Sequence, residues 1–249
     1  MSIAVHVKKK PKFYIGCSGF FNPQWKGVFY PQDMPQRTFL EYYAERLNSL
    51  EINTSFYHFP TPERLKGFSG RTPARFNFTV KAPRLITHMK RFKDCGRLLD
   101  DFYNACEKGL KKKLGCLLFQ MTPSFHYSEE RLDLLIRSMK PGFKNVIEFR
   151  HEGWWNETVY SEFAKNKIIF CNISHHSLPQ TIVVNTPVAY MRLHGVPNLY
   201  YSDYSRAQLK TIYQALSNMP KLKEAYVYFN NTAGTAGIQN ALLLQKIAC

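Results

Sequence analysis

Short apolar segments alternate with longer segments of helical periodicity along the whole chain. Residues 114–119 form a continuous apolar run, which is typical of a strand buried on both faces. Leu132 and Leu135 then recur at helical spacing after Ser128, a favoured N-cap residue. Pro141 ends this predicted helix. Strands are predicted at residues 13–17, 50–53, 76–80, 114–119, 145–149, 168–172, 188–193 and 225–229.

The order of these elements predicts an α/β fold. The other helices are predicted at residues 37–47, 62–68, 92–108, 154–165, 205–217 and 236–247. No clear helix follows the sixth strand before Thr186, so the sixth β/α unit is expected to be degenerate. We therefore predict one (β/α)8 TIM-type barrel domain over residues 1–249, with a basic tail at residues 1–12. A doubly wound open sheet is the alternative, although no Gly-x-Gly-x-x-Gly follows the first strand.

Composition supports a folded protein outside the membrane. Of the 249 residues, 45% are hydrophobic and 15% aromatic, which is enough for a substantial core. No apolar run approaches the roughly 18 residues of a membrane span, and the basic N-terminus lacks an apolar signal segment. The six cysteines show no Cys-x-x-Cys pairing, so we expect reduced thiols and a cytoplasmic location.

The charge balance favours anionic partners. Thirty-four Lys and Arg against eighteen Asp and Glu give a net charge of +16. Residues 81–113 contribute ten basic and four acidic side chains to this excess. Such a charge favours binding to DNA or RNA through counterion release, although proteins that bind no nucleic acid also have basic surfaces.

The fifth predicted strand ends in a cluster of charged residues. Glu148 and His151 follow the buried end of this strand, and in a barrel they would meet Glu51 and His194 on one face. Glu148 is the candidate general acid or base, with His194 or His151 as its partner and Glu51 beside them. The alternative is a structural ion pair between Glu148 and Arg150 that only fastens a loop.

Three cations at strand ends suggest an anion clamp. Lys81, Arg150 and Arg192 each follow or end a predicted strand, and at least two of them are expected to face one pocket. The small polar run 230–237 opens the last helix and is either a phosphate-binding loop or an ordinary N-cap loop. The predicted amide ligands are Asn53, Gln120, Asn230 and Asn231.

The same face of the predicted barrel also carries a possible metal site and two aromatic loops. A metal bound by Glu51, Glu148, His151 and His194 is conceivable, but no metal-binding histidine spacing is present and Arg150 beside Glu148 favours an anion. We therefore predict no required cofactor. The aromatic loops at residues 20–25 and 56–59 are expected to cover the barrel as a lid or to stack on a ring.

Distinctive blocks cover almost the whole chain in order, at residues 16–20, 25–31, 51–53 with 56–57, 81 with 86–88, 120 with 123, 148–151 with 154, 190–195 and 229–231. Together they resemble the YecE-like family, also called domain-of-unknown-function family seventy-two. The resemblance implies a TIM-type barrel with polar residues at its strand ends, and it implies no established reaction. Fold-level likeness to sugar-isomerase-like and abasic-site-endonuclease-like barrels is analogy only, and the endonuclease metal ligands have no match here. The chain departs from the pattern at Phe20 and Phe21, where Trp is frequent, and at Thr54 and Ser55.

These observations lead to one main hypothesis and two alternatives. The main hypothesis is a barrel enzyme that acts by general acid/base chemistry on a phosphate-bearing substrate, plausibly a nucleic acid or a nucleotide. The first alternative is a nucleic-acid-binding protein without catalysis, in which residues 81–113 supply the affinity. The second is a sugar-phosphate isomerase or epimerase, for which the high charge is incidental.

Overall fold

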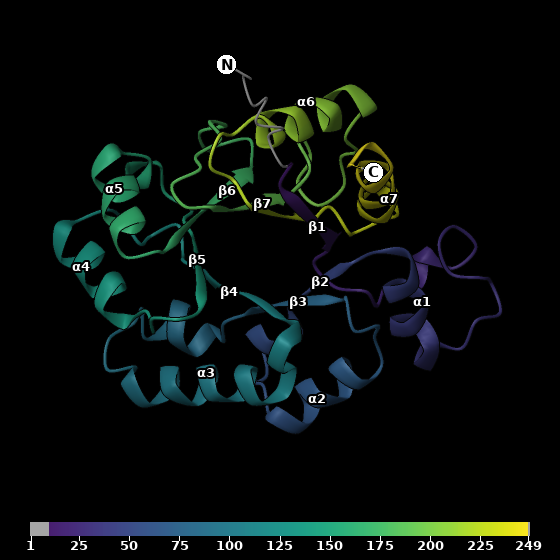
Figure 1. Cartoon of the computed structure of the whole chain (residues 1–249), viewed down its shortest axis with the longest axis horizontal. Coiled ribbons are helices and arrows are strands. Elements are labelled where there is room, and N and C mark those ends of the chain that lie inside the picture. The colour runs from purple at the N-terminus through teal and green to yellow at the C-terminus, as the bar shows by residue number, and fades with distance from the viewer. Residues whose placement is uncertain (1–9, 249) are drawn as a thin grey trace, which may run out of the picture.

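Eight parallel strands form one nearly closed barrel in the computed structural model, which describes residues 10–248 (Figure 1). The strand order around the sheet is β1-β8-β7-β6-β5-β4-β3-β2, and every paired strand is parallel. This confirms the predicted TIM-type barrel. Of the predicted basic tail, residues 1–9 lie outside the described residues. The strands are β1 (Lys12–Cys17), β2 (Ser49–Ile52), β3 (Asn77–Lys81), β4 (Leu114–Gln120), β5 (Lys144–Glu148), β6 (Ile169–Ser174), β7 (Val188–Leu193) and β8 (Glu224–Phe229).

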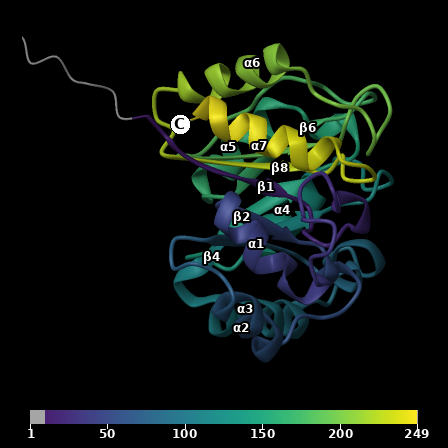
Figure 2. The ribbon, with the colours of Figure 1, turned by 90° about the vertical axis from the view of Figure 1, so that its right-hand side faces the viewer.

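Helices surround the barrel, and Ser128 begins one of them as the predicted N-cap. Ser128 accepts a hydrogen bond from Arg131 N, and Ser205 forms a capping box with Gln208. Seen from the side, α6 and α7 cover one side of the barrel and α2 and α3 the other (Figure 2). No helix within residues 10–248 is long and apolar enough to cross a membrane. The α-helices are α1 (Phe39–Arg46), α2 (Pro62–Gly70), α3 (Gly96–Leu110), α4 (Glu129–Ser138), α5 (Glu157–Lys165), α6 (Arg206–Ser217) and α7 (Ala236–Ala248).

The third and sixth β/α units depart from a regular barrel. Between β6 and β7 the described chain contains no helix, which confirms the degenerate sixth unit. Helix α3 begins at Gly96 rather than at Phe92 as predicted. Residues 85–89 form a π-helical turn, and Arg91, Phe92 and Asp94 then adopt positive φ angles. These left-handed residues interrupt the helix and leave a long loop above β3.

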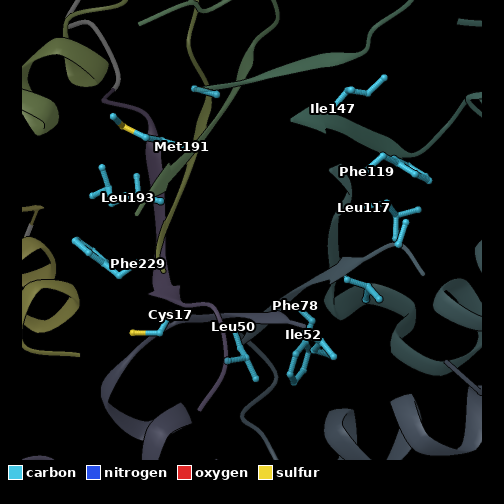
Figure 3. Packing of buried hydrophobic residues seen from close by; sticks show 14 of the residues in the cluster. Cys17, Leu50, Ile52, Phe78, Leu117, Phe119, Ile147, Met191, Leu193 and Phe229 are labelled. Atoms are coloured by element: carbon cyan, nitrogen blue, oxygen red, sulfur yellow. The ribbon is translucent and has the colours of Figure 1, made fainter. Parts of the chain in front are cut away.

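The main apolar core lies between the strands and the helices. Leu50, Leu117 and Ile147 point outward from the ring of strands, as do Leu193 and Phe229 on the opposite side (Figure 3). A second, smaller cluster fills the interior of the barrel, where Tyr14 and Tyr226 stack with their ring centroids 4.5 Å apart. Side chains therefore alternate between outward apolar packing and an interior that is rich in polar groups.

Side chains close the barrel between β1 and β2. No backbone ladder joins these two strands within the described chain, and the side chain of Asn48 bridges them instead. It accepts from Ile15 N at 2.7 Å and donates to Phe13 O at 2.8 Å. A Cβ atom at Gly16 would stand 2.0 Å from Ser49 O, so only glycine permits this approach of the strands.

Candidate functional site

The two-residue period of the strands places the candidate residues inside the barrel. Along β7, Tyr190 and Arg192 point inward, while Met191 and Leu193 pack outward in the main core. The same alternation brings polar side chains together at the carboxyl ends of other strands. They are Glu51 on β2, Lys81 on β3, Gln120 on β4 and Glu148 on β5.

Arg192 joins the two buried carboxylates. Its Nε and Nη2 atoms donate to the two oxygens of Glu51 at 3.1 and 2.7 Å, and Nη1 donates to Glu148 Oε2 at 2.7 Å. Ser18 and Tyr190 also donate to Glu51, at 2.6 and 2.5 Å. Burial opposes the charge of Arg192, but the two carboxylates outweigh it and raise the pKa of the guanidinium further.

Arg150 is held by Glu148 and His194. Its Nε atom donates to Glu148 Oε1 at 2.5 Å, and Nη2 lies 3.1 Å from His194 Nε2. A guanidinium can only donate, so His194 Nε2 accepts and the ring proton resides on Nδ1. The amide nitrogen Nδ2 of Asn230 lies 2.8 Å from Nδ1, and turning this amide over would place its oxygen there to accept that proton. Burial holds the pKa of His194 well below its usual range, so the ring is neutral at neutral pH.

The surroundings of Glu148 differ from those of a general acid. Burial alone would raise its pKa, but Arg150 and Arg192 outweigh burial and hold the pKa well below the usual range. The side chain is fully buried, and one arginine occupies each of its oxygens. Glu148 is therefore ionised at neutral pH and committed to both arginines. This arrangement suits a positioning carboxylate, and the acid/base role of Glu148 stays a prediction.

Lys81 has no counter-ion of its own. Its Nζ donates to Gln120 Oε1 at 2.6 Å and lies 4.1 Å from the ring centroid of Phe56. Among the described residues it forms no ion pair with a carboxylate, because arginines occupy both Glu51 and Glu148. Burial, together with the nearby charge of Arg192, lowers the pKa of Lys81 to about 8.

These residues surround a cavity of about 260 Å³ at the carboxyl end of the barrel. All three predicted clamp residues, Lys81, Arg150 and Arg192, line it. Asn53 also lines it, and the buried Oδ1 atom of Asn53 has no hydrogen-bond partner in the part of the chain described. Three cations thus face two carboxylates, which leaves one net positive charge. The remaining lining residues are Phe56, Tyr57, Gln120, Tyr200 and Asn230.

The residues predicted to be catalytic do not line this cavity. Glu51, Glu148 and His194 lie beneath its wall and hold the arginines. His151 faces elsewhere: its ring stacks on His126 at 4.1 Å and its Nδ1 accepts from Gly153 N, which caps a short turn. Its predicted place beside Glu148 is therefore corrected.

Asn231 is also displaced from the predicted amide set. Its side chain donates to Ser202 O at 2.9 Å and to Asn240 Oδ1 at 3.1 Å, so it ties the loops after β7 and β8 to helix α7. Of the polar run 230–237, only Asn230 reaches the cavity. The carbonyl of Gly234 instead accepts from the indole of Trp25 at 3.0 Å.

Sequence reasoning missed two kinds of residue. Tyr200 lines the cavity from the loop after β7, and its position beside Tyr201 in a polar loop was an available signal. Tyr190 supports Glu51 from one layer deeper in the barrel, and only the inward alternation along β7 could have indicated it. Of the two predicted aromatic loops, residues 56–59 contribute Phe56 and Tyr57 to the cavity. Residues 20–25 do not line it.

A metal site and a second, larger cavity are the other candidates for a functional site. Within residues 10–248, no three His, Cys, Asp or Glu side chains converge as metal ligands would, and Arg192 lies between the two central carboxylates. A larger cavity of about 540 Å³ opens at the opposite end of the barrel, between α4, α5 and the starts of β5 to β7. Its described wall contains no acidic residue or histidine. Because charged and amide side chains converge on the smaller cavity, we take that cavity as the candidate site.

Comparison with known families agrees with the geometry. The profile of DUF72, a protein family of unknown function, matches residues 14–248. The chain belongs to the DUF72 family. The UPF0759 protein YecE of Escherichia coli O157:H7 is 25% identical over 183 residues, which are 73% of this chain and 62% of that relative. The UPF0759 protein YunF of Bacillus subtilis is 24% identical over 156 residues, which are 60% of this chain and 54% of that relative. The DUF72 chain thus spans about half to three-fifths of the length of these relatives.

Solved structures share the barrel. A crystal structure of a DUF72 protein from Thermotoga maritima is 29% identical, covers 95% of this chain and 98% of its own, and superposes with a TM-score of 0.85. A DUF72 protein from Enterococcus faecalis is 20% identical, covers 95% of each chain and gives a TM-score of 0.80, which shows the fold alone. These likenesses confirm the family resemblance and the TIM-type barrel, and they name no activity.

Proposed function

We propose that this DUF72 protein is an enzyme that binds a small phosphate-bearing substrate in the cationic cavity. The excess of positive charge carries the proposal. Lys81, Arg150 and Arg192 line the cavity, and the two nearby carboxylates are already paired with arginine. An anion would balance the remaining charge in a site where low solvent exposure strengthens electrostatic attraction.

The size and polarity of the cavity narrow the class of substrate. A volume of about 260 Å³ suits a sugar phosphate or one nucleotide unit rather than a nucleic-acid duplex. Asn53 lines the cavity, and rotation of its amide would let the unpaired Oδ1 atom accept a hydrogen bond from a hydroxyl of the substrate. Tyr57 and Tyr200 offer ring faces at the mouth. A hydroxylated phosphate ester satisfies these features together.

Acid/base chemistry in this proposal falls to Lys81. Arginines stay protonated in proteins, whereas a lysine with a pKa of about 8 can both give and take a proton near neutral pH. Arg150 and Arg192 would hold the phosphate, while Glu51, Glu148 and His194 position those arginines. The same residue roles would suit a sugar-phosphate isomerase or epimerase, because either reaction moves a proton beside an anionic group.

Binding to single-stranded nucleic acid is a second candidate function. The basic segment 81–113 divides between the two ends of the barrel, and its residues Lys90, Arg91 and Lys93 lie in the loop after β3, on the side of the cavity. Tyr57 lies in the loop after β2 and Tyr201 in the loop after β7, and these residues are 67% and 69% exposed. Cations interleaved with exposed rings suit a single strand, of which one unit would enter the cavity.

Calorimetric titration tests the main proposal. The ligands are inorganic phosphate, ribose 5-phosphate, a nucleoside 5′-monophosphate and neutral ribose, each at one fixed ionic strength. We expect the phosphate esters to bind, neutral ribose to bind far more weakly, and inorganic phosphate to compete with the esters. Absence of binding by every phosphate compound at millimolar concentration would refute the proposal.

A further inference from the structure

Lys81 differs in its partners from two other partly buried lysines, Lys144 and Lys113. Lys144 also points inward, at the opposite end, and there it pairs with Glu224 at 2.5 Å. Lys113 donates to the backbone oxygens of Ser69 and Thr72 at 2.6 and 2.7 Å. Lys81 instead has a single neutral acceptor, Gln120, and the face of an aromatic ring.

The position of Lys81 keeps its amine reactive. The residue is only 9% exposed and lies in the wall of a cavity that two arginines share. Burial and neighbouring positive charge both favour the neutral amine, which is the nucleophilic form. With a pKa of about 8, roughly a tenth of the amine is neutral at pH 7, about 200-fold more than for an ordinary lysine. The face of Phe56 opposes this shift by favouring the cation, and it also shields the amine from solvent.

We propose that Lys81 forms an imine with an aldehyde or ketone whose anionic group is held by Arg150 and Arg192. This inference rests on the proposed anion site and adds a covalent step to it. Because the two arginines and Lys81 line one small cavity, an anion bound by the arginines would place a nearby carbonyl carbon beside the amine.

The step balances without a cofactor. The lone pair of the neutral Nζ atom attacks the carbonyl carbon, a C–N bond forms, and the carbonyl π electrons move to oxygen, which takes a proton from nitrogen. The resulting carbinolamine gains one proton from solvent on its hydroxyl and loses water, leaving a protonated C=N bond. Hydrolysis reverses the imine, whereas reduction converts it into a stable secondary amine.

Reductive trapping tests this proposal on the full chain. The protein is incubated at pH 7 with glycolaldehyde phosphate, pyruvate or uncharged glycolaldehyde, and sodium cyanoborohydride supplies the hydride that reduces C=N to a stable secondary amine. Peptide mass spectrometry then gives the labelled fraction of each lysine. We expect Lys81 to carry at least about 10-fold more label than Lys144 with an anionic carbonyl compound, because Arg150 and Arg192 would hold that compound beside the amine of Lys81.

The arms of the experiment separate the sources of the anionic group. Preferential labelling by glycolaldehyde phosphate assigns a phosphate-bearing carbonyl, and preferential labelling by pyruvate assigns a carboxylate-bearing one. Excess inorganic phosphate should suppress the label on Lys81, and uncharged glycolaldehyde, which the arginines do not hold, should label Lys81 less than glycolaldehyde phosphate does. Lys81→Arg should lose the adduct, whereas Lys144→Arg should retain it. Labels spread evenly over surface lysines would overturn the proposal.

A non-reactive ligand distinguishes failure of this step from failure of the anion site. Glycerol 3-phosphate carries a phosphate and hydroxyls but no carbonyl group. If it binds to the wild-type protein while no carbonyl compound is trapped at Lys81, the imine is refuted and the anion site stands. If it does not bind either, both proposals fail.

Discussion

The guanidinium of Arg192 lies against the carboxylate of Glu51 in a two-point pairing, with Nε to Oε2 at 3.1 Å and Nη2 to Oε1 at 2.7 Å. Neither side chain is more than 1% exposed. The pair joins β7 to β2 across the barrel, and a third donor, Nη1, reaches Glu148 on β5. One buried arginine therefore fixes three strands at the base of the cavity.

Removing that arginine should destabilise the protein strongly. Arg192→Met leaves Glu51 buried without its cation, and we expect the free energy of unfolding to fall by about 3–5 kcal/mol. Urea unfolding of the variant measures this loss. Arg46→Met is a matched control, because Arg46 pairs with Glu45 on the exposed surface and such pairs contribute about 0–1 kcal/mol. Equal losses in the two variants would contradict the structural role of Arg192.

Glu148 should make the stability depend on pH in the acid range. Its pKa in the folded protein is held well below the usual range, so its ionised form stabilises the folded state above the unfolded pKa of about 4.3. That contribution is lost as the pH falls below this value. The difference in unfolding free energy between wild type and Glu148→Gln should be constant above about pH 5 and should shrink below about pH 4. A difference that grows on acidification would show that Glu148 is protonated in the folded protein.

Anion affinity should follow the protonation of Lys81. The cation attracts a bound phosphate and the neutral amine does not, so affinity for ribose 5-phosphate should fall as the pH rises through about 8. Calorimetry from pH 6.5 to pH 9.5 measures this profile. Lys81→Arg, whose guanidinium stays charged, should remove the fall over the same range. An unchanged profile in that variant would assign the titration to another group.

The period of the strands and the charge at their ends were enough to predict the barrel and most of the cavity wall. Inward residues such as Lys81 and Gln120 follow from counting by two along short strands. The pairing of Glu51 and Glu148 with arginines could not be predicted, because it depends on contacts that span the barrel. Glu51 and Arg192 are 141 residues apart in the chain, and they meet only when β2 and β7 close around the interior.

The same limit explains the residues that were misplaced. His151 follows Arg150 directly, but past the strand end the backbone turns, and His151 caps the next turn rather than facing the cavity. Loop conformation of this kind depends on local hydrogen bonds that a pattern of residue types does not specify. The left-handed residues Arg91, Phe92 and Asp94 shortened helix α3 for a similar reason.

The two ends of the barrel provide a test for contact with nucleic acid. Lys90, Arg91 and Lys93 lie on the side of the cavity, whereas Lys108, Lys111 and Lys112 lie where α3 leads into β4, at the opposite end. Replacing the first three with glutamine should lower the salt dependence of single-strand binding by about 2 in the logarithmic slope, and replacing the second three should not. Fluorescence anisotropy over a salt series measures both slopes. Equal changes for the two sets would mean that the cavity end is not the contact surface.

The most direct test of the cationic cavity is the affinity of ribose 5-phosphate for Arg150→Gln, measured by calorimetry beside wild type and Arg84→Gln. Arg150 lines the cavity, whereas Arg84 is an exposed arginine in the loop after β3, outside the cavity wall. Loss of a charged hydrogen bond predicts about 10- to 150-fold weaker binding for Arg150→Gln and little change for Arg84→Gln. Equal affinity in all three proteins would contradict the assignment of this cavity as the anion site.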